Sequence, residues 1–283
     1  MERRFQQVDV FGTRPYTGNP VAVVTDAEGL TDGQMLQLTR WTNLSEAAFL
    51  LPPTTPEADY RVRIFTLAGE LPFAGHPTLG SCHAWLASGG KPRHDDEIVQ
   101  ECGVGLVGLR RRDGMLWFAA PPLVRSGPVD EAYVAELAAG LGVGRGEIVD
   151  AAWVDNGPGW VCLLLRDAAA VLSVEPAFEH QSRGARLDIG LVGMYPPGSE
   201  CAIEVRALFP EEPGILRADP VTGSLNASIG QWLLGSGRLE PPYVASQGTR
   251  LGRLGRPRID QDAGGQGWVG GQTFTCIRGT IEL

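Results

Sequence analysis

Three side chains that can take up and release protons, Glu46, His76 and Asp219, lie beside signals of local structure in this sequence. Glu46 stands between a polar turn and the apolar run at 47–51, so its carboxyl is expected to be partly desolvated. Desolvation raises the pKa of a carboxyl toward neutrality, which suits a group that must both remove and return a proton. Taken alone, the residues around Glu46 favour a surface glutamate at the start of a strand, which is the commoner situation.

His76 and Asp219 occupy equivalent places in an internal repeat. Arg63 stands 13 residues before His76, and Arg206 stands 13 residues before Asp219. Each copy continues with a proline, a Gly-Ser pair and an apolar run that carries Trp-Leu. An offset of 143 residues in a chain of 283 indicates two similar halves, each one structural unit.

Each copy predicts a strand, a turn and then a helix opened by Pro77 or Pro220, where a missing N–H costs nothing. The small pairs at 80–81 and 223–224 leave backbone N–H groups accessible in the first turn. Helix N-termini carry unpaired donors and a partial positive charge, so each half is predicted to bind an anion.

Local rules alone assign ordinary roles to His76 and Asp219. Asp219 before a proline is a good N-cap, and His76 reads as a polar residue at a helix start with its ring on a neighbouring carbonyl. Their pairing through the repeat favours a chemical role for both. A positive helix end lowers the pKa of a histidine, which favours the neutral imidazole as donor and acceptor.

The composition is that of a soluble globular chain, with 43% hydrophobic and 20% charged residues. A net charge of −9 argues against a nucleic-acid partner, and no stretch has the length of a membrane span or the form of a signal peptide. We therefore expect a cytoplasmic protein. The five cysteines are widely spaced and include no Cys-x-x-Cys, so neither disulfides nor a metal site is expected. No glycine-rich turn has the strand and helix context of a dinucleotide site, so no cofactor is expected.

Periodicity and turn signals predict further elements. A helix should run from the cap Thr31-Asp32 to residue 41, and the strand 98–109 should form a hairpin with 115–119 across Asp113-Gly114. The proline-rich stretch 121–128 is the expected linker between the halves. The other expected strands are 5–10, 21–25 after a turn at 18–20, 61–65, 148–154, 160–165, 188–195, 201–209 and 274–281, and the other helices are 77–87, 130–141, part of 171–187, and one ending at 229–234.

The paired motifs resemble those of the PhzF-like proteins, the phenazine-biosynthesis isomerase family. They are Gly75-His-Pro-Thr-Leu-Gly80 and Asp219-Pro-Val-Thr-Gly-Ser224, and the likeness extends from Val8-Asp9-Val10-Phe11 to Val269-Gly270-Gly271. The resemblance implies an α+β fold like that of diaminopimelate epimerase and proline racemase, whose members carry cysteines at the two positions held here by His76 and Asp219. Each half would be a curled, mostly antiparallel sheet around a central helix, with the active site in the cleft between the halves. We place the halves at 1–125 and 126–267, with the strand at 268–283 returning to the first.

The same resemblance implies a function. Ser45-Glu46 matches the family's Ser-Glu-Thr motif, whose glutamate is the catalytic acid-base, and His76 and Asp219 match residues that line the active site. Gly75, Gly223 and Ser224 match anion-binding positions. The expected protein is a homodimeric, cofactor-independent isomerase that moves a proton and a double bond in a small carboxylate-bearing metabolite, such as a cyclic dihydro-hydroxy acid. The family's best-known substrate is dihydrohydroxyanthranilate; three departures from the motifs, Ala47, Ala218 and Val221, argue for a different one.

Two other functions stay open. A racemase or epimerase of a small amino or hydroxy acid would use two thiols, but the two motif positions are His76 and Asp219, and Cys82 lies six residues beyond His76. A non-catalytic protein could keep the anion site and turn nothing over. The presence of Glu46 together with His76 and Asp219 favours the isomerase.

Overall fold

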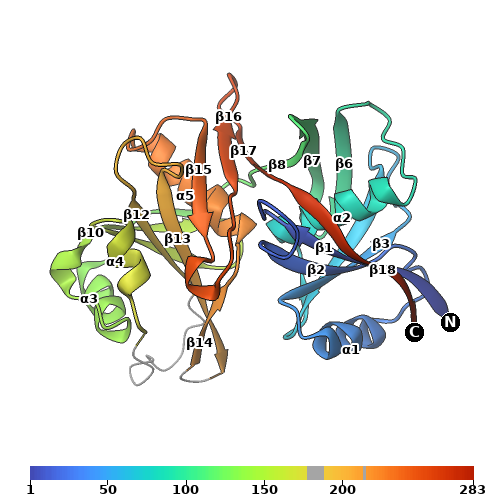
Figure 1. Ribbon diagram of the computed structural model, residues 1–283, viewed down its shortest axis with the longest axis horizontal. Coiled ribbons are helices and arrows are strands. Elements are labelled where there is room, and N and C mark those ends of the chain that lie inside the picture. The colour runs from blue at the N-terminus through green and yellow to red at the C-terminus, as the bar shows by residue number, and fades with distance from the viewer. Residues whose placement is uncertain (177–187, 213–214) are drawn as a thin grey trace. The chain divides into compact units, whose positions relative to one another are not determined.

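The computed structural model describes residues 1–176, 188–212 and 215–283 (Figure 1). The chain divides into two compact units. The first comprises Met1–Ala119 and Trp268–Leu283, and the second comprises Ala120–Gly267. Each unit combines strands with a few helices, so the predicted α+β class is confirmed. Among the residues that the structure describes, no helix is both long and apolar enough to cross a membrane.

The first unit is a sheet that curls until its ends come together. Pairing runs in the order β18, β1, β2, β3, β4, β6, β7, β8, β17, and only the β2–β3 and β4–β6 pairs are parallel. The two terminal strands of this series, β17 and β18, are consecutive in the chain and are separated by Gln272 alone. The sheet therefore surrounds an interior. Its strands are β1 (Glu2–Val10), β2 (Asn19–Val24), β3 (Glu46–Leu51), β4 (Tyr60–Thr66), β5 (Glu70–Leu71, paired with β4), β6 (Glu97–Cys102), β7 (Gly105–Arg112), β8 (Met115–Ala119), β17 (Gly267–Gly271) and β18 (Thr273–Glu282).

Helix α2 (Gly75–Ala87) fills that interior and contacts β1, β2, β3, β8 and β18. Every residue from Gly75 to Cys82 is buried. Gly80 lets the helix approach β2 closely, because a methyl group at this position would lie 2.3 Å from Val21 Cγ1. Trp85 stacks on Tyr60 at a centroid distance of 5.1 Å near the other end of the helix. The prediction of a curled, mostly antiparallel sheet around a central helix is therefore confirmed for the first unit.

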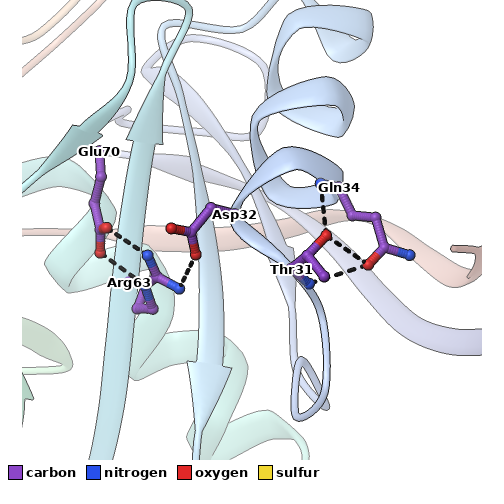
Figure 2. A network of polar contacts seen from close by, with 5 residues as sticks. All are labelled: Thr31, Asp32, Gln34, Arg63 and Glu70. Atoms are coloured by element: carbon purple, nitrogen blue, oxygen red, sulfur yellow. Dashed lines mark hydrogen bonds and ion pairs between the residues drawn. The ribbon is translucent and has the colours of Figure 1, made fainter.

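Helix α1 (Asp32–Thr42) covers the outer face of the same sheet. Thr31 and Gln34 form a capping box at its start, where the cap was predicted. Asn43 follows the helix in the left-handed conformation, and the helix ends one residue beyond the predicted end at 41. Figure 2 shows how Arg63 of β4 joins this helix to the sheet: it donates to Asp32 at 2.8 Å and holds Glu70 through a two-point contact. The pKa of Asp32 is lowered by its hydrogen bond to Arg63.

The second unit also has a sheet with a buried helix on one face, and it carries further helices on the other face. Strands pair in the order β9, β10, β11, β12, β13, β15, β16, with β14 on β13, and only β11–β12 and β13–β15 are parallel. The strands are β9 (Arg125–Pro128), β10 (Ile148–Asp155), β11 (Trp160–Leu165), β12 (Asp188–Met194), β13 (Ile203–Glu212), β14 (Ile215–Asp219), β15 (Tyr243–Gln247) and β16 (Arg258–Gln261). The helices are α3 (Glu131–Gly140), α4 (Ala168–Ser173) and α5 (Gly223–Gly235), with 3-10 turns η1 (Arg145–Glu147) and η2 (Thr249–Leu251).

Strand β11 shows how this sheet separates two cores. Trp160, Cys162 and Leu164 face the cluster that contains Leu225, Ile229 and Leu233 of α5. The intervening side chains, Val161, Leu163 and Leu165, face the cluster formed with α3 and α4. Because strand side chains alternate between faces, a fully apolar strand can pack on helices on both sides. Helix α5 is thus the buried counterpart of α2.

Several predicted boundaries were wrong, and each error has a local cause. The expected strand 98–109 is two strands, because the chain turns at Gly103-Val104, and the expected linker 121–128 contains β9, which pairs with β10. Strand β2 already begins at Asn19, so 18–20 is not wholly a turn. Helix α2 begins at Gly75, which places His76 inside its first turn rather than before it.

The start of the second central helix was also predicted wrongly. Pro220 does not open α5; the helix begins three residues later at Gly223, with Thr222 as the N-cap. Asp219 is instead the last residue of β14, a strand that sequence patterns did not predict. Of the predicted helix 171–187, residues 171–173 belong to α4 and residues 174–176 are not helical. Residues 177–187 lie outside the described residues.

Replacement of Gly80 tests whether close helix packing limits this fold. We expect Gly80→Ala to lower the free energy of unfolding by about 1–3 kcal/mol, because the added methyl group overlaps Val21. Helix propensity alone would give the opposite sign, a gain of up to about 1 kcal/mol. Urea denaturation of the variant measures which effect is larger.

Two companion variants make the test specific. Gly33→Ala places the same methyl group on the exposed side of α1, where the nearest atom is 4.0 Å away, and should not destabilise. Val21→Ala in the Gly80→Ala background should recover part of the loss. Equal stability of the Gly80 and Gly33 variants would show that α2 does not approach β2 so closely.

Candidate active site

Glu46 and His76 are brought together in the first unit. Glu46 is the first residue of β3, which starts shortly after α1 ends, and His76 lies in the first turn of α2. The distance from His76 Nε2 to Glu46 Oε2 is 3.5 Å, and the two side chains are 3% and 16% exposed. This separation is slightly too long for a good hydrogen bond but short enough for both groups to reach one substrate atom.

The other side of the His76 ring faces the start of β2. Asn19 Nδ2 lies 3.4 Å from His76 Nδ1, and the Pro20 backbone also hydrogen bonds to the ring. Asp9 holds this part of the chain, because its buried carboxylate accepts hydrogen bonds from the Thr17 and Gly18 amides. The His76 ring is therefore oriented through Nδ1, while Nε2 faces Glu46.

His76 is neutral at physiological pH. Burial lowers its pKa to about 3, and this effect outweighs the hydrogen bond with the Pro20 backbone, which acts in the opposite direction. A neutral imidazole can donate from one ring nitrogen and accept at the other. The predicted neutral form agrees with the structure, although the main cause is burial and not the helix end.

Asp219 lies in the second unit, within a separate polar cluster. It ends β14, and its Oδ2 accepts a hydrogen bond from the Thr222 hydroxyl at 2.6 Å. Gln247 Nε2 donates to the Thr222 hydroxyl oxygen at 3.0 Å and to the Asp219 carbonyl at 3.2 Å. The predicted N-cap role of Asp219 is wrong, because Thr222 occupies that position and Asp219 belongs to a strand.

Gly223 and Ser224 form the first turn of α5. Trp160 Nε1 donates to Ser224 Oγ at 3.3 Å, and Asn156 Nδ2 donates to the Ser224 carbonyl at 3.0 Å. A serine oxygen that accepts from tryptophan keeps its own hydrogen for another acceptor. Neither α5 nor α2, whose first residue is Gly75, has a side-chain hydrogen bond at its N-cap.

The three departures from the family motifs are packing changes. Ala47 belongs to the apolar cluster that β3 shares with Met35 and Leu38 of α1, on the side of the strand opposite Glu46. Ala218 packs on the α3 and α4 cluster, and Val221 is buried against Gly255. All three side chains thus pack in apolar parts of their own units.

Some residues of these clusters were not found from the sequence. The sequence predicts a turn at Asn19 and strands at Asp9 and Trp160, and it does not single out Gln247. A polar residue inside an apolar strand, such as Asp9 in β1, was the one available signal. The contacts of Asn19 and Gln247 depend on pairing between strands that are distant in the chain, so local sequence signals do not predict them.

The thiols and possible metal ligands do not suggest other chemistry. Burial raises the pKa of every cysteine thiol, to about 12 for Cys82, so these groups are poor nucleophiles near neutral pH. In the described parts of the chain, histidine, cysteine and acidic side chains form no group of three that could hold a metal ion.

The neutral state of His76 predicts a pH-dependent stability. Its pKa is about 3 when folded and about 6.5 when unfolded, so the unfolded chain binds more protons below pH 6.5 and stability falls as the pH falls. Between pH 7.5 and 5 this group alone should remove about 2 kcal/mol from the free energy of unfolding. Urea titrations of the native protein and His76→Asn should show a shallower pH slope for the variant. Parallel slopes would mean that the ring is protonated in the folded protein.

Comparison with known proteins connects this arrangement to a family. The family model of phenazine biosynthesis-like proteins, PhzC-PhzF, matches residues 8–273. The antisense-enhancing sequence 1 protein of Schizosaccharomyces pombe is 35% identical over 294 residues, covering 98% of this chain and 98% of that protein. The trans-2,3-dihydro-3-hydroxyanthranilate isomerase of Pseudomonas fluorescens is 30% identical over 284 residues, again covering 98% of each chain.

Solved structures show the same fold. The PhzF-family phenazine biosynthesis protein of Bacillus anthracis matches with a TM-score of 0.82 at 18% identity, covering 100% of both chains. The sheet curled around α2 and the second sheet around α5 are thus found in a fold already observed by experiment. A family model that matches nearly the whole chain, with full-length relatives at 35% and 30% identity, shows that this protein belongs to the PhzC-PhzF family of phenazine biosynthesis-like proteins.

Proposed function

We propose that this protein is an isomerase that moves a proton, and with it a double bond, within a small carboxylate-bearing metabolite, without a cofactor. The observation that carries the proposal is the contact between Glu46 and a buried, neutral His76 at 3.5 Å. One group can exchange a proton with carbon while the other donates to or accepts from the substrate. The name of the Pseudomonas fluorescens relative supports an isomerase of this kind.

The proposed step is an internal proton transfer. Glu46 removes a proton from an sp³ carbon next to a double bond, the electron pair of that C–H bond moves into the conjugated system, and Glu46 returns the proton at its far end. One C–H bond breaks and another forms, so the substrate is neither oxidised nor reduced. Neutral His76 stabilises the charge that develops on the substrate during transfer, because its ring is already oriented by Asn19 and Pro20.

The proposed roles in the second unit are in substrate binding. The carboxylate of the substrate binds at the first turn of α5, where the amides of Gly223 and Ser224 and the Ser224 hydroxyl are donors. Gly75 offers the corresponding amide at the first turn of α2. The Asp219 carboxylate accepts from a hydroxyl or amino group of the substrate, for which a cyclic dihydro-hydroxy acid is the model.

Exchange of Glu46 for an amide tests the chemical step. In D₂O the native enzyme should isomerise a true substrate and introduce deuterium at one carbon. Glu46→Gln should lower kcat by about two to four orders of magnitude, the usual effect of losing a positioned acid-base, while substrate still binds. NMR of the product and titration of substrate into the variant measure the two effects.

Glu101→Gln is the matched control, because the Glu101 side chain is 13% exposed and Glu101 also lies on a strand of the first unit. This variant should keep near-native turnover. If Glu46→Gln also kept near-native turnover, Glu46 would have no part in the chemical step and the mechanism would be wrong.

Loss of the Ser224 hydroxyl tests the anion site of the second unit. We expect Ser224→Ala to weaken binding of a small carboxylate such as benzoate by about tenfold, the usual value of a hydrogen bond to a charged group. Ser228→Ala removes a buried hydroxyl from the same helix and should leave the affinity unchanged. Calorimetric titration of both variants decides; equal affinities for the two would remove Ser224 from the site.

A further inference from the structure

Gln247 is a fully buried glutamine at the end of β15, next to the start of α5. Its Nε2 donates to Thr222 Oγ1 at 3.0 Å and to the Asp219 carbonyl at 3.2 Å. Its Oε1 accepts from the Thr222 amide at 3.0 Å and from Asn226 Nδ2 at 2.7 Å. A primary amide has two hydrogens and two lone pairs, so these four contacts use its full capacity.

The direction of these bonds decides what the Thr222 hydroxyl does. Gln247 donates to Thr222 Oγ1, and the hydroxyl hydrogen of Thr222 then points to Asp219 Oδ2 at 2.6 Å. A threonine at an N-cap ordinarily turns its oxygen toward the amides of the first helical turn. Thr222 makes no such bond, so the first turn of α5 has no side-chain cap.

Gln247 also holds the backbone that joins β14 to α5. It contacts Asp219 on one side of the short connection and Thr222 on the other, so Pro220 and Val221 are bracketed by one side chain. Because Gln247 has no exposed surface, water cannot readily replace these contacts.

We propose that Gln247 is a positioning residue for Asp219: it keeps the Thr222 hydroxyl on the Asp219 carboxylate and away from the amides at the start of α5. Two consequences follow from this one side chain. The Asp219 carboxylate has a fixed orientation, and the first-turn amides stay available for an anionic group. The catalytic consequence rests on the proposed function, whereas the orientation of Asp219 does not.

Paired substitutions test the proposal. Gln247→Leu removes the four contacts, and Thr222→Val removes the hydroxyl while Gln247 stays in place. Each should move the ¹³Cγ resonance of Asp219 at a fixed pH of 8, and each should lower kcat by about tenfold, the usual scale for a hydrogen bond to a charged group. The double variant should be no worse than the more affected single variant, because both changes break the same chain of bonds. Thr222→Ser, which keeps the hydroxyl, should retain the native resonance and turnover.

Gln100→Leu controls for the loss of any buried glutamine. Gln100 is also fully buried, lies in β6 and donates to the Thr78 hydroxyl at 3.1 Å in the first unit. Gln100→Leu should lower the free energy of unfolding about as much as Gln247→Leu does, but it should leave the Asp219 resonance unchanged. If Gln247→Leu does not fold, Thr222→Val and Thr222→Ser still compare the Asp219 resonance and turnover without and with the Thr222 hydroxyl.

The outcomes separate the two proposals. An Asp219 resonance that moves no further in Gln247→Leu than in Gln100→Leu, or additive losses in the double variant, would overturn the positioning role. A resonance that moves as expected in a protein for which no isomerisation substrate is found would support the positioning role, and the proposed function alone would fail. The NMR measurement needs no substrate, so the two results are independent.

Discussion

In each unit a curled sheet buries the first two turns of one helix, and the other features of the site depend on this burial. Helix α2 is buried from Gly75 to Cys82, and α5 is buried from Gly223 to Gly230. A helix leaves its first amides without partners within the helix, and buried amides must find them elsewhere. Neither N-cap side chain supplies one. The anion sites proposed above lie at these two helix starts.

The same burial sets both the packing and the charge state of the site. Glycine is needed where helix and sheet come closest, at Gly80 beside Val21 and at Gly190 beneath Leu225. Burial also lowers the pKa of His76, which keeps the ring neutral next to Glu46. A change that loosened α2 in its sheet would therefore raise the pKa of His76 as well as lower the stability, because both depend on excluding water from the first turn.

Buried polar side chains orient the groups that burial alone would leave unspecified. Asp9 holds the amides before Asn19, and Asn19 contacts the His76 ring. In the second unit Gln247 and Thr222 act on Asp219 in the same manner. The candidate side chain is attached differently in the two units. His76 is part of its helix, whereas Asp219 ends a strand and is joined to its helix by a short connection. The repeat diverges at this point, so the equivalent positions carry a histidine in one unit and an aspartate in the other.

Features that depend on neighbours along the chain could be predicted from the amino-acid sequence. The start of α1 follows from Thr31, the Asp113-Gly114 turn has the positive φ angles that a tight hairpin requires, and the repeat indicated two similar halves. The motifs around His76 and Asp219 indicated the family through resemblance. Three features could not be predicted in this way: the start of α5, the strands at 215–219 and 125–128, and the contacts of Asn19 and Gln247 with the candidate residues. The physical reason is that short strands and buried polar contacts gain their stability from partners far away in the chain, and local propensity carries no information about those partners.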